Sequence, residues 1–203
     1  MSVTGKGVTM GAPSTIVNPL TINKNGQFTA PEGQAYGPVT VDVEMFSFVV
    51  KGSGSFTTSG DININFGDTS SDYSGNNQTV NFSYNDEKAH RVVATGNLTN
   101  ISFQNCTGLL SVDIPFPRSM RYTSSLSSCF KNCASLTSIP IGLFDNCPAV
   151  TSFSSCFFGC RALMGLAPGL WDTTKWPNVT LHSMCFYNCT GLSNYADIPS
   201  DWK

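Results

Sequence analysis

The sequence predicts a mainly β protein in three parts: an N-terminal arm with a β-hairpin, an antiparallel β-sandwich, and a C-terminal solenoid of stacked coils with short helical turns. The chain has 203 residues, of which only 12% are charged, but it contains 18 Gly and 11 Pro. This composition is typical of turns and strands rather than long helices. Hydrophobic residues alternate in the first half, and cysteines recur at a fixed interval in the second. We place the three parts at residues 1–45, 46–104 and 105–203.

Charge and hydropathy narrow the classes of partner. The net charge is −2, and the basic residues are scattered, whereas nucleic-acid-binding proteins usually carry a basic stripe. No apolar run approaches the roughly 18 residues that span a bilayer. We therefore expect neither nucleic acid nor membrane as a partner. The N-terminus lacks the apolar core of a secretory signal, so either an export signal is missing from this sequence or the protein is made and assembled in a cytosol.

The repeat lies in the second half of the chain, which holds all eight cysteines. Four segments align with one another: SFQNCTGL, CFKNCASL, CFFGCRAL and CFYNCTGL. The cysteine at the fifth position of each segment is Cys106, Cys133, Cys160 or Cys189, so the first two intervals are equal and the third is slightly longer. A fixed period of roughly 20–50 residues is typical of a solenoid, because one coil cannot bury its own apolar side and must stack on the next.

Equivalent positions of the coils are expected to form three buried columns, and these are the candidate structural residues of the chain. The columns are Phe103, Phe130, Phe157 and Phe186; Leu109, Leu136, Leu163 and Leu192; and Cys106, Cys129, Cys133, Cys156, Cys160, Cys185 and Cys189.

Three interpretations of the cysteines compete. A metal site is disfavoured, because C-x3-C without a nearby His matches zinc spacings poorly. The even number of cysteines permits disulfides. Buried free thiols are favoured over disulfides, because a small apolar Cys packs well in a narrow interior.

The segment LSSCFKNCASLTSIPIGLFDNCPAVTSFSSCFFGCRAL (residues 126–163) resembles the BspA-type leucine-rich repeats. The resemblance covers about residues 101–203 and includes the spacing of Phe, Cys, Leu and Pro. The segment is especially similar to a short variant of these repeats that occurs in surface proteins. It departs from that variant at Cys129, Cys156 and Cys185, where the variant commonly has Met. The resemblance implies an extracellular binding or adhesion module and not a catalyst.

Residues 46–104 show period-two alternation of apolar residues, interrupted by turn clusters, as expected of an antiparallel sandwich. The segments ININFGDTSSDYSG and VNFSYNDEKAHRVVATGNL resemble a PKD-like immunoglobulin sandwich, although Thr69 replaces the usual Gly after the F-G-D turn. Asp61, Asn63 and Asn65 have the alternating spacing of a calcium loop. A strand is favoured, because Ile62, Ile64 and Phe66 alternate with them.

The N-terminal part contains LTINKNGQFTAPEGQAYGPVTVDV (residues 20–43), which resembles a short module of phage virion proteins and phage fibre components. Its Asn25-Gly26 pair predicts a hairpin turn. Residues 1–19 are rich in Gly and Pro and predict an extended segment. Two hypotheses are equally supported for this segment: it is an anchoring arm that orders on a partner, or it is an ordinary disordered terminus.

Catalysis has little support, since His90 and His182 are the only histidines and none of the common catalytic motifs occurs. We expect no enzymatic activity, cofactor or metal. The favoured function is a phage virion structural protein, a head-fibre (capsid decoration) or tail-fibre component at the virion surface. Its arm would dock on a capsid or tail protein, its repeats would contact a host-surface protein or a glycan such as mucin, and a homotrimer is one option for its assembly. The alternative is a secreted or cell-wall bacterial BspA-like adhesin.

Overall fold

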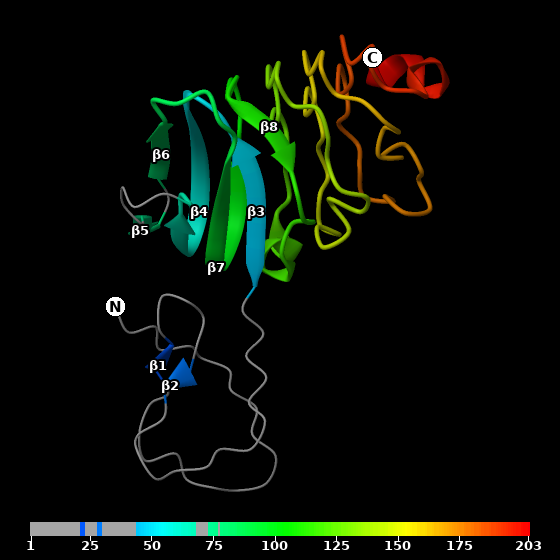
Figure 1. The fold of residues 1–203 in the computed structure, drawn as a ribbon. Helices are drawn as coiled ribbons and strands as arrows, with labels where there is room; N and C mark the ends of the chain where they lie inside the picture. The colour runs from blue at the N-terminus through cyan, green and yellow to red at the C-terminus, as the bar shows by residue number, and fades with distance from the viewer. Residues whose placement is uncertain (1–20, 23–27, 30–43, 68–72, 77) are drawn as a thin grey trace, which may run out of the picture. The chain divides into compact units, whose positions relative to one another are not determined.

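The computed structural model describes residues 21–22, 28–29, 44–67, 73–76 and 78–203 (Figure 1). The chain divides into two units, Met1–Val43 and Glu44–Lys203. In the first unit, β1 (Thr21–Ile22) pairs antiparallel with β2 (Phe28–Thr29). The predicted Asn25-Gly26 turn and the predicted arm at residues 1–19 lie outside the described residues.

The second unit is mainly β, as the composition predicted. Its described residues contain one six-stranded antiparallel sheet, with the strand order β5-β4-β7-β3-β8 and with β6 also paired to β4. The helices of the described residues are three short 3-10 turns. The strands are β3 (Met45–Val50), β4 (Ser53–Asn65), β5 (Tyr73–Gly75), β6 (Gln78–Ser83), β7 (His90–Ser102) and β8 (Leu109–Val112), and the turns are η1 (Arg118–Tyr122), η2 (Tyr195–Asp197) and η3 (Ser200–Trp202).

The sheet folds over onto itself at the middle of β4 and β7. The pairing of these strands shifts register between Ser59 and Gly60, and Gly60 has a φ of 107°. A side chain there would clash with the backbone carbonyl of Asn97, so the bend requires glycine. Before the bend, residues 53–58 of β4 pair with β6, whereas residues 62–64 pair with β5. Thr57 and Thr58 also pair with β7 on the other side.

An aromatic contact demonstrates the fold-over. Phe48 on β3 is level with the end of β4, because Phe48 pairs with Val92 of β7 and Asn65 pairs with the neighbouring Val93. In a flat sheet Phe48 would lie about nine residues, or roughly 30 Å, from Phe56. The two ring centroids are instead 5.1 Å apart. Phe48 and Phe56 therefore pack in the same hydrophobic core.

Phe103 connects this core to the repeats. Its ring centroid lies 4.8 Å from that of Phe48 in the sheet and 5.6 Å from that of Phe130 in the first repeated coil. The strand β8, which follows Cys106, also pairs with β3. One hydrophobic core therefore runs from the sheet into the coils.

Backbone hydrogen bonds join each coil to the next. The amide of Phe103 donates to the carbonyl of Cys129, that of Phe130 to Cys156, and that of Phe157 to Cys185, over 2.6–2.8 Å. Single parallel bridges such as Ser111 to Ser138 and Gly165 to Leu192 link the same coils. Figure 1 shows these loops side by side beyond β8.

Left-handed residues precede every cysteine except Cys147. The residue before the cysteine at the fifth position of each repeated segment has a positive φ; it is Asn105, Asn132, Gly159 or Asn188. Asn and Gly are the residues that adopt this conformation most readily, which explains why the sequence repeats Asn-Cys or Gly-Cys. The turns keep each coil short, so the coils pair through isolated bridges rather than long strands.

The C-terminal turn covers the last coil. The amide of Phe186 donates to the carbonyl of Trp202 in η3 over 2.8 Å, and Ile198 and Trp202 are buried. No helix in the described ranges is long and apolar enough to cross a membrane.

The packing of the coils predicts that truncating two apolar residues of one repeat has very different effects on the free energy of unfolding. Leu136 is fully buried, whereas Ile141 is fully exposed. Leu136→Ala should lower the free energy of unfolding by about 2–5 kcal/mol, because it leaves a cavity in the core. Ile141→Ala, the matched control, should change it by less than about 0.5 kcal/mol. Urea denaturation measures both, and equal effects of the two substitutions would contradict the packing.

Candidate functional site

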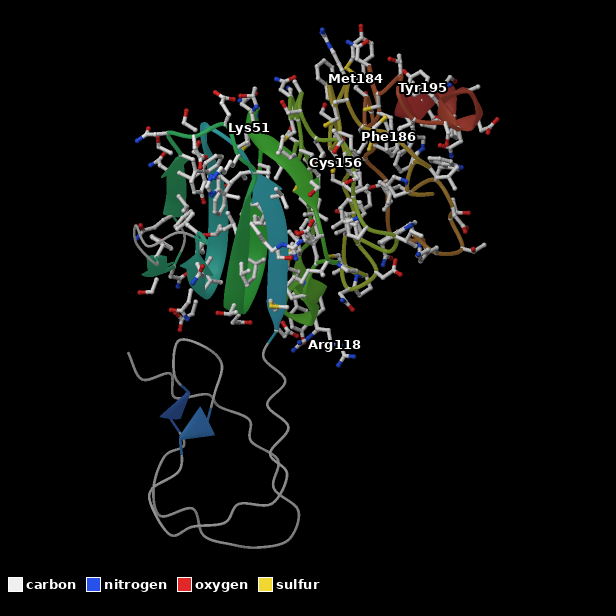
Figure 2. The ribbon with its side chains drawn as sticks, viewed as in Figure 1. Lys51, Arg118, Cys156, Met184, Phe186 and Tyr195 are labelled. Atoms are coloured by element: carbon white, nitrogen blue, oxygen red, sulfur yellow. The ribbon has the colours of Figure 1, made fainter. Side chains whose placement is uncertain are left out.

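The residues that the sequence predicts to form columns all lie in the interior of the second unit, and each is less than 5% exposed. The phenylalanine rings stack face to face along the coils. Their centroids are 5.6, 5.1 and 5.5 Å apart from Phe103 through Phe130 and Phe157 to Phe186, and their planes differ by at most 12°. Figure 2 labels Phe186 of this stack and Cys156. These side chains hold the coils together and do not reach a ligand.

The thiols add hydrogen bonds between coils. The Sγ–H groups of Cys133, Cys160 and Cys189 donate to backbone carbonyls one coil earlier, over 2.9–3.0 Å. The three acceptors are the carbonyls of the stacked phenylalanines Phe103, Phe130 and Phe157. A cysteine can fill the narrow interior as an apolar side chain and still donate. All eight cysteines are free and buried.

Burial also makes these thiols unreactive. It raises the pKa of Cys106 to about 11 and the pKa of Cys147 and Cys189 to about 12. It also raises the pKa of Cys156 and Cys185 well above the ordinary thiol value. The thiolate is the form that attacks electrophiles, so burial keeps these thiols in the unreactive protonated form at neutral pH.

The acidic and amide pattern lies within β4, an interior strand that pairs with β5 on one side and with β7 on the other. Asp61 and Asn63 pair with Asn97 and Thr95 of β7, while Ile62 and Ile64 are buried between them. Among the described residues, no three His, Cys, Asp or Glu side chains are grouped so that they could hold a metal ion.

His90 contacts Asp86 and Tyr84 beside the turn between β6 and β7. Its Nε2 lies 2.6 Å from Oδ1 of Asp86, and its ring stacks on Tyr84 at a centroid distance of 3.7 Å. The hydrogen bond from His90 lowers the pKa of Asp86. The Tyr84 hydroxyl donates to the carbonyl of Phe66 over 2.7 Å. These contacts fasten the turn to the sheet.

The second histidine belongs to an aromatic pocket at the C-terminal end of the coils. The pocket has a volume of about 270 Å³ and is lined by Trp171, Trp176 and Trp202 together with His182, Asp201 and Thr173. Trp171 and Trp176 come from the last long loop, His182 precedes the final cysteine pair, and Asp201 and Trp202 come from η3. The turn that covers the last coil therefore also closes one side of the pocket.

Ring contacts fix the pocket walls. His182 lies flat on Trp202, with centroids 4.4 Å apart and planes 7° apart. Trp171 meets Trp202 at 69° and Phe186 of the stack at 84°, with centroids 6.4 and 6.1 Å apart. Trp176 stands edge-on to Phe153 at 5.6 Å. The three indoles are thus held by the core rather than by a mobile surface.

Polar groups lie at the rim of the pocket. The Asp201 carboxylate is 63% exposed, and its Oδ2 is 3.8 Å from Nδ1 of His182, which is too far for a direct hydrogen bond. That Nδ1 is buried and has no hydrogen-bond partner. The carboxylate is therefore free to accept hydrogen bonds from a ligand.

Sequence reasoning did not identify this pocket. One signal was present: all three tryptophans of the chain fall between positions 171 and 202. Trp171 also stands one repeat period after Phe144, which is buried. A larger aromatic with a polar N–H at a repeat position marks a departure from the repeat.

No protein-family model, no curated protein and no solved structure matches this chain.

Thiol labelling tests the cysteine column. In urea, without reductant, a thiol reagent should modify all eight cysteines, because none is oxidised. In the folded protein at neutral pH the same reagent should react at least about a hundredfold more slowly, since the thiols are buried and protonated. Mass spectrometry that finds linked cysteine pairs in freshly purified protein would contradict this expectation.

Alkaline pH should destabilise the fold. An unfolded thiol ionises near pH 8.5, whereas in the folded protein the raised pKa values of Cys106 and Cys147 keep both protonated to higher pH. Their contribution is complete below about pH 8.5 and falls as pH rises toward 11, because the unfolded state then binds fewer protons.

The expected slope is about 1.4 kcal/mol per pH unit for each such thiol. Urea denaturation at several pH values between about 8 and 10 measures it. Cys147→Ala removes one thiol, so the variant should show a shallower slope than the parent. A free energy of unfolding that does not change over this range would contradict the raised pKa values.

Proposed function

We propose that the chain is a non-enzymatic surface protein that displays its C-terminal repeats for contact with a host-surface protein or glycan. In this proposal residues 46–104 are a PKD-like immunoglobulin sandwich and residues 105–203 are a leucine-rich-repeat solenoid. The fold-over of the sheet at Gly60 and the hydrogen bonds that recur from coil to coil support these assignments.

One observation carries the proposal: the aromatic pocket stands at the end of the coils that is distant in sequence from the first unit. Its walls are held by the same stack that holds the coils. A rigid module with a fixed aromatic site at its far end suits display, because a preformed site loses little conformational entropy on binding.

The exterior of the coils supports the same function. Hydroxyl and amide side chains at the surface satisfy carbonyls of the neighbouring coil: Thr137 bonds to Leu110 and Ser193 bonds to Gly165, each over 3.0 Å. Asn132 likewise donates to the side chain of Asn105 over 2.9 Å. Such an uncharged polar surface suits contacts that depend little on salt.

The favoured setting is a phage virion, as a head fibre, capsid decoration or tail-fibre component. The resemblance of residues 20–43 to a module of phage virion proteins supports it. Residues 1–45 would then attach to a capsid or tail protein. A bacterial cell-surface adhesin is the second candidate, and the Phe and Cys register of the coils, which resembles BspA-type surface repeats, favours it.

Truncation of the first unit tests the virion setting. Phage particles that lack the protein are mixed with the full chain or with residues 44–203 alone, and bound protein is measured after sedimentation. The full chain should decorate the particles, whereas the truncated chain should lose at least about 90% of the binding and keep its thermal transition. If the truncated chain decorates the particles, the attachment site lies in residues 44–203 and the proposed role of the first unit is wrong. A full chain that does not bind particles would favour the adhesin.

A further inference from the structure

We propose that the pocket formed by Trp171, Trp176, His182, Asp201 and Trp202 binds one neutral pyranose ring of a glycan. This inference deepens the proposed function and rests on it, because it names the ligand class and the site of the display module. Four features of the pocket carry it: its size, its aromatic wall, its hydrogen-bonding groups and its charge.

The size of the pocket fits a single ring. Pockets that enclose drug-sized ligands have volumes of about 300–1,000 Å³, and this pocket has about 270 Å³. It therefore accommodates a small ligand, or the terminal unit of a longer chain whose remainder stays in solvent.

The aromatic wall provides a platform for the apolar face of a sugar. A pyranose has one face of C–H bonds, and these carry partial positive charge that is attracted to the negative face of an aromatic ring. Trp171 is only partly buried, and its ring edges are fixed by Phe186 and Trp202. Trp202 itself is 5% exposed and is covered on one face by His182, so Trp171 is the residue that stacks on the ligand.

The polar groups of the pocket match sugar hydroxyls. The Asp201 carboxylate can accept hydrogen bonds from two adjacent hydroxyl groups, and the hydroxyl of Thr173 can donate or accept. Within the described residues the indole N–H groups of the three tryptophans make no hydrogen bond, and none is among the buried groups without a partner. A tryptophan N–H normally finds a partner where it is buried, so these donors are left for water or a ligand.

The charge of the pocket selects against acidic sugars. Of the described residues that line it, Asp201 alone is acidic and none is Lys or Arg. The nearby Lys175 lies over the ring of Trp176, with its Nζ 5.8 Å from the ring centroid. The same Nζ is 2.8 Å from Oδ1 of Asp145, so this cation already has an acidic partner. A sialic acid or a sulfated sugar would bring a second negative charge next to Asp201 without a compensating cation. The ligand is therefore a neutral hexose or N-acetylhexosamine.

Tryptophan fluorescence of the full chain reports on this site directly, because the three tryptophans of the protein are all in the pocket. The probes are the methyl glycosides of galactose, glucose, mannose and N-acetylgalactosamine. The comparators are the methyl glycoside of N-acetylneuraminic acid and cyclohexanol, which has an apolar ring without the hydroxyl array. For one ring the expected Kd is on the order of 1 mM.

Three variants locate the binding. Trp171→Ala should weaken binding at least about tenfold, and Trp176 and Trp202 still report in this variant. Asp201→Ala, at an exposed position that leaves the core intact, should weaken it by roughly tenfold. Tyr122→Ala is the matched control: Tyr122 is an aromatic residue, 77% exposed, and does not line the pocket. It should leave the Kd within about twofold.

The expected result is a saturable change with at least one neutral glycoside, and none with the sialoside or cyclohexanol. The proposal is overturned if no neutral glycoside binds at about 50 mM, if cyclohexanol binds equally well, or if the sialoside binds more tightly. It is also overturned if Asp201→Ala and a folded Trp171→Ala protein bind like the parent. Binding to phage particles is measured separately. A protein that binds particles but shows no glycoside binding therefore refutes only this inference. A sugar-binding protein that does not decorate particles refutes only the virion setting.

Discussion

The hydrogen bond from one phenylalanine amide to the cysteine carbonyl of the next coil sets the geometry of the C-terminal half. It recurs from Phe103, Phe130 and Phe157 and fixes the coil-to-coil register. With the backbones in that register, the rings stack at 5.1–5.6 Å. The backbone hydrogen bonds and the ring contacts therefore join the same pairs of segments and support each other.

The cysteine column follows from the same constraint. A short coil with left-handed turns beside its cysteines leaves little interior space and leaves carbonyls that point inward. A thiol is small enough to fit and can donate to such a carbonyl, as Cys133 does to Phe103. Burial suppresses ionisation, so the residue type that is most often reactive is here a packing element. The chemistry of the protein must therefore be sought at its surface.

The two ends of the stack carry side chains that do not recur along the repeat. At one end the folded-over sheet covers Phe103, and at the other the turn of η3 places Trp202 on the last coil. The sequence of the η3 turn differs from that of the repeated segments, so it contributes side chains that those segments do not have. The aromatic pocket arises from this break in the repeat, and its rigidity comes from the stack behind it.

The sequence alone determined the mainly β class and the repeat period, because these follow from local composition and from a pattern that repeats. The repeated Phe, Leu and Cys residues that it singled out are all buried. It also indicated the hairpin partners in β1 and β2, since an Asn-Gly pair between short apolar runs is a local signal. Tertiary structure alone decided the bend at Gly60, the sharing of Phe103 between sheet and coils, and the pocket. The pocket combines Trp171 with Trp202, which lie more than one repeat period apart in the chain, and their contact depends on where the C-terminal turn packs. No periodic pattern encodes such a contact, because it forms only once, at the place where the repeat ends.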